Sequence, residues 1–226
     1  EGGVDSRLVT AGMTDENLSV SSLRKVRPEE GSPPPAQSVR RHVRPNAATA
    51  NEARLVAAMA GRDGDALPGL FADGMEAVHY PTGLVFNKDG NVSSLRMLLE
   101  SDTPRFGIDT LATLGDSLCL SRNTVSATSA TAGTLDLGAF EMELVVLNEV
   151  DEQARCRRLE FFAADRLGNA IARLYERYAE FLPDGPERER AAATARSVAA
   201  LLGADPDRYA TALTPAVKYT DHRTIG

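Results

Sequence analysis

One histidine, one tyrosine and three glutamates are the residues best suited to chemistry, because each lies in a stretch with strand character. His79 and Tyr80 are adjacent, and Glu141, Glu143 and Glu160 lie in two later stretches. A neutral imidazole can act as a general base near pH 7, and a hydrogen-bond donor facing it completes a site for proton transfer. We therefore take His79 as the candidate catalytic residue.

Strand geometry limits how these side chains combine. Neighbouring residues of a regular strand point to opposite faces, so His79 and Tyr80 cannot both enter one cavity from such a strand. Glu141 and Glu143 share one face of their strand, and the apolar residues between and beside them share the other. The alternative is that His79 is a structural residue of the strand, with its imidazole hydrogen-bonded to the backbone or to solvent. The candidate ligand-binding residues of an apolar cavity are His79, Tyr80, Phe140, Met142 and Phe162.

Other chemistries have little support in the sequence. The histidines His42, His79 and His222 are scattered without metal-ligand spacing, so we predict no metal site and no cofactor. The sequence has no G-x-S-x-G motif and no Gly-rich phosphate-binding loop. Cys119 and Cys156 fall in predicted strands without a CxxC spacing, which predicts two buried thiols in a reducing compartment.

Composition narrows the classes of partner. A formal net charge of −7 argues against a dedicated nucleic-acid binder, which needs a concentrated positive surface. The basic cluster from Arg40 to Arg44 is either a contact for an acidic partner or nucleic acid, or a solvated linker. We expect no signal peptide, and the sequence has no apolar run of the roughly 18–20 residues that a membrane helix needs. We expect a cytoplasmic protein without membrane contact.

The elements that position these residues follow a clear order along the chain. The stretch Ala139–Leu182 reads as a hairpin that runs into an amphipathic helix. Before it, the pattern predicts a helix entered at Asn46 or Thr49, a short helix carrying Leu67, Leu70 and Phe71, a strand, a helix after Asn87, and two further strands. Helices first and antiparallel strands later predict an α+β domain with helices on one face of a curved sheet and a cone-shaped cavity between them.

The sequence also contains an internal repeat. Residues 195–203 parallel residues 53–61, and with one insertion His222 aligns with His79 and Gly226 with Gly83. The alternative is chance similarity between two Ala-rich helices. The repeat predicts a linker over 1–45, a complete domain over 46–185, and the start of a truncated second copy over 186–226. On this interpretation the chain is a fragment of a longer protein.

The chain resembles the SnoaL-like branch of the NTF2-like superfamily. The resemblance rests on Pro45–Thr49, on Leu111–Leu118 and on the hairpin–helix unit from Glu149 to Tyr178. The stretch Thr220–Gly226 is similar to an Asp-His-Arg strand motif of these domains, of which Val78–Gly83 keeps the histidine and the final glycine. The resemblance implies an NTF2-like cone, with a strongly curved antiparallel sheet wrapped on N-terminal helices and a C-terminal helix. It is strongest to tandem repeats at the C-terminal ends of large bacterial ATPase or nucleotide-cyclase regulators.

Three functions are compatible with this sequence. The first is a non-catalytic module that binds a small apolar ligand or mediates association within a larger bacterial regulator. The second is a small enzyme of the polyketide-cyclase or isomerase type with His79 as general base. The third is a device for dimerisation through the outer sheet face, with a homodimer partner or the neighbouring repeat.

Overall fold

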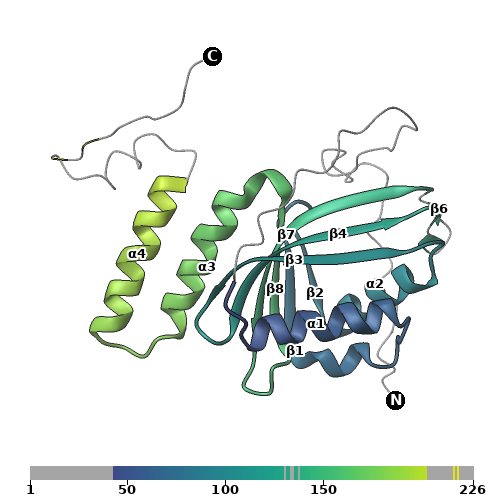
Figure 1. Cartoon of the computed structure of the whole chain (residues 1–226), viewed down its shortest axis with the longest axis horizontal. Coiled ribbons are helices and arrows are strands. Elements are labelled where there is room, and N and C mark those ends of the chain that lie inside the picture. Colours follow the sequence, from purple (N-terminus) through teal and green to yellow (C-terminus); the bar gives the residue numbers. More distant parts are fainter. Residues whose placement is uncertain are drawn as a thin grey trace, which may run out of the picture.

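A six-stranded sheet forms the centre of the molecule, with helices on both of its faces (Figure 1). The computed structural model describes residues 43–129, 131–132, 135–136, 138–202, 216 and 218. The sequence positions expected to form the linker and most of the second copy, including His42 and His222, lie outside these residues.

The predicted elements occur in the predicted order, and the structure adds three short strands, β2, β5 and β6, that the pattern did not predict. They are α1 (Ala47–Ala60), η1 (Leu67–Leu70), β1 (Phe71–His79), β2 (Leu84–Asn87), α2 (Lys88–Glu100), β3 (Arg105–Leu114), β4 (Leu118–Ala127), β5 (Thr131–Ala132), β6 (Leu135–Asp136), β7 (Phe140–Val150), β8 (Cys156–Ala163), η2 (Ala164–Arg166), α3 (Leu167–Phe181) and α4 (Pro186–Leu202). The α+β class is therefore confirmed. The expected second helix is a single 3-10 turn, and Phe71 opens β1 instead of closing that helix.

The start of α1 is fixed by Asn46, as its position before an alanine-rich helix predicts. Its side-chain oxygen accepts a hydrogen bond from the Thr49 amide at 3.0 Å, and the Thr49 hydroxyl accepts one from the Asn46 amide at 2.9 Å. The Asn46 side-chain amide donates to the carbonyls of Gly115 and Leu118. This capping box therefore also ties α1 to the turn between β3 and β4.

The sheet differs from the expected one in the direction of one strand pair. The strand order is β2-β1-β8-β7-β4-β3, and β1 runs parallel to β8 while the other pairs are antiparallel. A tight turn forces antiparallel pairing, but β1 and β8 are far apart in sequence, so no turn sets their direction. The sheet is mixed and open, with β2 and β3 at its edges.

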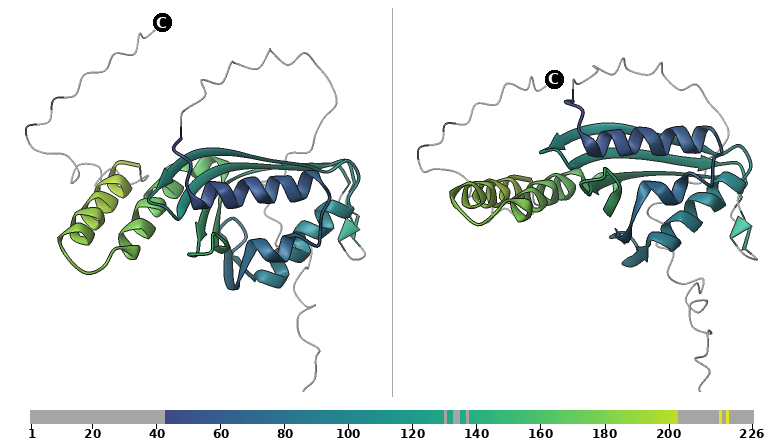
Figure 2. Two further views of the ribbon diagram at one scale, coloured as in Figure 1. Left: turned by 60° about the horizontal axis from the view of Figure 1, so that its bottom comes forward. Right: turned by 90° about the horizontal axis from the view of Figure 1, so that it is seen from below.

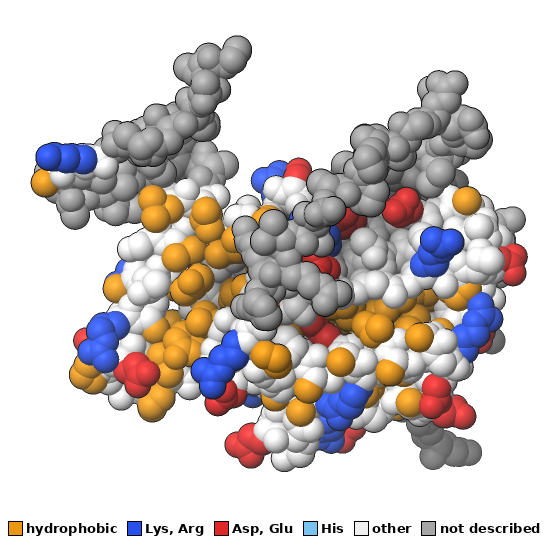
Figure 3. Space-filling model, in the orientation of Figure 1, with side chains coloured by type: hydrophobic (Ala, Val, Ile, Leu, Met, Phe, Trp, Pro, Cys, Tyr) orange, Lys and Arg blue, Asp and Glu red, His pale blue; other side chains and the backbone are white. Residues whose placement is uncertain are grey.

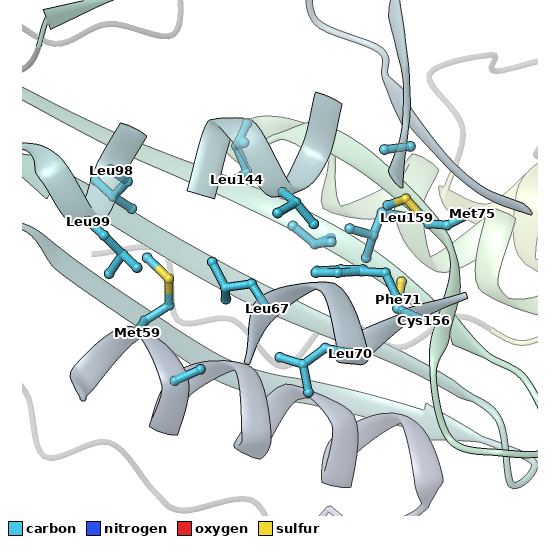
Figure 4. Close-up of a cluster of buried hydrophobic side chains, with 14 residues drawn as sticks. Met59, Leu67, Leu70, Phe71, Met75, Leu98, Leu99, Leu144, Cys156 and Leu159 are labelled. Carbon is cyan, nitrogen blue, oxygen red and sulfur yellow. The ribbon is translucent and has the colours of Figure 1, made fainter. Parts of the chain in front are cut away.

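Two apolar clusters hold helices to opposite faces of the sheet. Leu144 and Val146 of β7 belong to the cluster beneath α1 and α2, which Figure 4 shows together with Met59, Leu67 and Phe71. Val145 and Leu147, which alternate with them along β7, belong to the cluster beneath α3. The continuous apolar run of β7 is thus buried on both faces, as predicted. We call the face toward α1 and α2 the inner face and the face toward α3 the outer face.

The last two helices form a pair of their own. α4 packs along α3, and both lie on the other side of the molecule from α2 (Figure 2). Adding a Cβ at Gly168 near the start of α3 would bring it 2.7 Å from the backbone oxygen of Leu202, so the close approach of these helices requires glycine there.

Candidate functional site

The inner face carries a border of half-buried apolar side chains. Phe106, Val125, Phe140, Met142 and Phe161 come from β3, β4, β7 and β8 and pack against the buried cluster while keeping part of their surface exposed. Leu55, Phe86 and Leu95 join them from α1, β2 and α2. We call these eight side chains the apolar rim. In Figure 3 hydrophobic side chains gather along the line where α1 meets the sheet.

His79 lies at the β1 end of this face. It pairs with Leu84 on β2 and with Phe161 on β8, and its ring lies 5.6 Å from the ring of Phe161. Burial lowers the pKa of His79, so the imidazole is neutral at neutral pH. Its Nδ1 lies 2.8 Å from the Thr82 hydroxyl. The tautomer that donates from Nδ1 to Thr82 leaves Nε2 free to accept a proton.

The structure separates the five expected ligand-binding residues. His79, Phe140 and Met142 lie on the inner face, but Phe162 belongs to the cluster beneath α3. Tyr80 also lies on the outer face, where its ring is 4.8 Å from that of Phe162. Tyr80 and Phe162 therefore cannot line one cavity with the other three. The residue that joins His79 is Phe161, one position earlier, because the parallel register of β1 and β8 places it there.

Glu160 is held by cations rather than placed for proton transfer. Its carboxylate is fully buried and accepts hydrogen bonds from Arg158 Nε at 2.6 Å, Arg173 Nε at 2.9 Å and the Tyr80 hydroxyl at 2.8 Å. Burial opposes the charged form, but these donors outweigh it and hold the pKa of Glu160 below its ordinary value. Glu160 is therefore an ionised anchor beneath α3.

The basic residues of β8 form ion pairs with glutamates of the sheet. Arg157 pairs with Glu149, which also accepts a hydrogen bond from Arg177 of α3 at 2.6 Å. The guanidinium groups of Arg157 and Arg177 both lie over the Phe181 ring. These arginines thus bind α3 to the sheet. Glu143 forms its ion pair with Arg122 on the neighbouring strand β4.

Glu52 is a candidate residue that the sequence reasoning missed. It lies on α1 with 5% of its surface exposed, and its Oε1 accepts a hydrogen bond from the Ser121 hydroxyl at 2.5 Å. Burial raises the pKa of Glu52. A signal was available, since Glu52 stands on the helical stripe of Ala48, Leu55 and Met59 that faces the sheet.

Two asparagines share this part of the inner face. Asn123 of β4 and Asn148 of β7 alternate with residues of the outer cluster, so both point inward. The side-chain oxygens of Asn123 and Asn148 are buried, and neither has a hydrogen-bond partner among the residues that the structure describes. The same holds for Oε2 of Glu52. We call Glu52, Ser121, Asn123 and Asn148 the inner polar set.

A separate groove of about 580 Å³ lies between α3 and α4. Alanines form its apolar part, and both signs of charge border it. The lining residues are Glu176, Ala179, Glu180, Arg188, Ala192, Ala195, Arg196, Ala199 and Ala200. Figure 3 shows hydrophobic side chains gathered over these two helices.

The described residues provide no group of three or more His, Cys, Asp or Glu side chains that could hold a metal ion. Cys119 and Cys156 are free and buried, as predicted, and burial raises the pKa of both thiols. None of the helices in the described ranges is long and apolar enough to cross a membrane.

Comparisons with known proteins give matches among solved structures alone. The chain matches no protein-family model, and no match is found among curated proteins. An uncharacterised cystatin-fold protein from Novosphingobium aromaticivorans is 21% identical, covers 52% of this chain and 97% of its own, and has a TM-score of 0.42. An NTF2-like protein of unknown function from Exiguobacterium sp. 255-15 is 15% identical, covers 51% of this chain and 98% of its own, and has a TM-score of 0.40.

A Δ5-3-ketosteroid isomerase from a Mycobacterium species is 12% identical, covers 52% of this chain and 92% of its own, and has a TM-score of 0.41. At these identities and scores the matches assign no activity, ligand or residue role to this chain.

Proposed function

We propose that the chain is a binding module that takes a small apolar ligand on the inner face of the sheet. The apolar rim is the observation that carries this proposal. Its side chains come from seven different elements, converge on one face and remain half-buried after folding. A ligand that covers them removes apolar surface from water, which stabilises the complex by about 25 cal/mol for each Å² buried.

The proposal places the module in the SnoaL-like branch of the NTF2-like superfamily, within a larger cytoplasmic regulator of bacterial origin. The element order and the resemblance described above support this placement. An association role fits the same context. Because α3 covers the outer face over β4, β7 and β8, we place the contact with a homodimer partner or a neighbouring repeat on the α3–α4 pair rather than on the sheet itself.

His79 supports a second candidate, an enzyme of the isomerase or cyclase type. Its imidazole is neutral, contacts Phe161 of the rim and has Nδ1 oriented by Thr82. General acid–base catalysis also needs a group that exchanges the second proton. Within the described part of the chain Thr82 is the polar side chain bonded to His79, and Tyr80 and Glu160 face the other side. We therefore favour binding over catalysis.

A ligand-shift thermal melt of the full chain tests the proposal. The panel consists of small apolar metabolites, and the variants are Met142→Gln in the rim and Met97→Gln on the exposed side of α2. A ligand at 100 times its Kd contributes about 2.7 kcal/mol, which raises the Tm by roughly 5–10 °C for a chain of this size. We expect that shift in the wild type and in Met97→Gln, and a much smaller one in Met142→Gln.

The proposal fails if no compound raises the Tm, or if both methionine variants respond alike. His79→Ala separates the two candidate functions. Ligand binding without turnover that survives this change supports the module, whereas turnover that disappears with His79 while binding persists supports the enzyme.

A further inference from the structure

Glu52 differs from the other buried acids in the described part of the chain. Glu149 and Glu160 are equally buried, and each is paired with two arginines. No described Lys or Arg side chain forms an ion pair with Glu52. Its Oε1 accepts a hydrogen bond from the Ser121 hydroxyl, and burial raises the pKa of the carboxyl group more than the Ser121, Cys119 and Thr110 side chains lower it. A buried carboxyl group without a cation is held in its neutral form or bonded to something else.

The polar atoms near Glu52 are incompletely satisfied. Oε2 of Glu52 and the side-chain oxygens of Asn123 and Asn148 are buried without a partner among the described residues. Glu52 and Asn148 are 5% and 2% exposed. Leaving a buried polar atom unpaired carries a substantial free-energy penalty, so three such atoms in one region require an explanation.

These atoms are continuous with the apolar rim. Along β4, the inward-pointing residues run from Val125 through Asn123 to Ser121, that is, from the rim to the hydroxyl bonded to Glu52. Asn123 is half-buried and lies beside Leu144 of β7, and Asn148 lies on the same strand further along. A molecule seated on the rim therefore borders Asn123, and Ser121 with its partner Glu52 follows along the sheet.

We propose that the inner face selects ligands that carry a hydroxyl group, which accepts a hydrogen bond from Glu52 and donates one to the amide oxygen of Asn123. This inference rests on the proposed ligand-binding function. The chemistry follows from the two kinds of unpaired group. The amide oxygens accept hydrogen bonds, so they need a donor. A neutral carboxyl group can donate from its protonated oxygen while its other oxygen accepts from Ser121.

A hydroxyl group is the simple substituent that both donates and accepts. A ketone or an ether accepts only, so it leaves the amide oxygen of Asn123 unpaired. A carboxylate also lacks a donor and would place a negative charge beside acceptor oxygens. The set therefore favours an alcohol or phenol over an ether, a ketone or an acid of the same shape.

Matched probes test this selectivity on the full chain. The pairs are 2-naphthol with 2-methoxynaphthalene, and 1-decanol with 1-methoxydecane, measured by equilibrium dialysis at pH 7. One net hydrogen bond corresponds to a preference of about tenfold. We expect each hydroxyl compound to bind about tenfold tighter than its methyl ether.

Variants assign the preference to particular atoms. Asn123→Leu removes the amide oxygen and Glu52→Leu removes the carboxyl group, while Asn169→Leu on the exposed side of α3 is the matched control. Leucine replaces Glu52 because a glutamine amide would still donate to the ligand and accept from Ser121. We expect the preference to fall toward unity in the first two variants, with ether binding unchanged, and to persist in the control. Asn123 is half-buried, so its variant remains informative if Glu52→Leu fails to fold.

The outcomes separate this inference from the proposed function. Binding of apolar compounds without a hydroxyl preference on either scaffold overturns the inference and leaves the proposed function in place. Loss of all apolar binding overturns both. A hydroxyl preference that Asn123→Leu and Glu52→Leu both leave unchanged also overturns the inference.

Discussion

Arg173 of α3 donates from its Nε to both carboxylate oxygens of Glu160 on β8, at 2.9 and 3.2 Å. Because Glu160 is fully buried beneath the helix, this contact fixes α3 to the outer face of the sheet. The same guanidinium group also reaches Glu176 and Glu180 on its own helix, which limits its orientation. α3 is thus attached by charge as well as by apolar packing.

Replacing Arg173 with Met should destabilise the chain by about 2–3 kcal/mol, because Glu160 loses charged donors in a buried site. Arg158 and Tyr80 remain bonded to Glu160, which keeps the loss below that of a fully unpaired charge. Urea unfolding measures the effect. The control is Arg166→Met, which removes an exposed pair with Asp165 and should change stability by less than about 1 kcal/mol. Equal effects in both variants would contradict the anchoring role.

Glu160 should also affect how the free energy of unfolding depends on pH under acidic conditions. Its folded pKa lies below the unfolded value, so the unfolded chain binds the proton more readily. The stability that Glu160 contributes is therefore present above a pH of about 4.5 and is lost as the pH falls through the folded pKa. Unfolding free energies of wild type and Glu160→Gln, measured from pH 7 down to pH 3, should converge at the acid end. Parallel profiles would refute this assignment.

The sequence predicted the parts of the fold that depend on local patterns. The Ala139–Leu182 unit forms as a hairpin and a helix because alternation, turn and helical periodicity follow one another without interruption. Asn46 caps α1 because a side-chain acceptor precedes a run of good helix formers. Gly115 adopts a positive φ of 60° in the predicted turn between two strands.

Local sequence patterns could not predict how strands far apart in the sequence pair with one another. The parallel register that joins His79 to Phe161 links residues far apart in sequence, so the candidates named from the sequence included Phe162, one residue away, instead of Phe161. The outer position of α3 depends on the pairs that Arg173 and Arg177 form with glutamates of the sheet. Glu52 lies on an apolar stripe of α1, so its position predicts that it is buried. Periodicity alone does not predict how the buried carboxyl group is bonded.

Glu52 should show the opposite pH dependence to Glu160. Burial raises its folded pKa above the unfolded value of about 4.5, so the folded chain binds the proton more readily. Its contribution to stability is present below the unfolded pKa and is lost as the pH rises through the folded pKa. Glu52→Gln keeps an acceptor for Ser121 without a charge, and it should therefore be more stable than wild type at pH 8 by about 1 kcal/mol or more, an advantage that shrinks toward pH 4.

Denaturant midpoints at pH 4, 6 and 8 measure this difference. Glu100→Gln changes an exposed carboxylate at the end of α2 and serves as the control, with no comparable trend expected. If Glu52→Gln loses stability at every pH, the carboxylate itself is bonded to a donor within the fold, and the neutral form is not the one the fold prefers.

Gly168 determines how closely α3 and α4 approach. Alanine is favoured over glycine in a helix by about 1 kcal/mol, so an isolated α3 would gain from Gly168→Ala. In the folded chain the added Cβ would lie 2.7 Å from the backbone oxygen of Leu202, which forces the end of α4 away from α3. We expect faster amide hydrogen exchange in the C-terminal half of α4, with little change in β7. Gly69→Ala, where a Cβ meets nothing within 4 Å, should leave exchange in α4 unaltered. Unchanged protection of α4 in Gly168→Ala would show that the two helices do not depend on this contact.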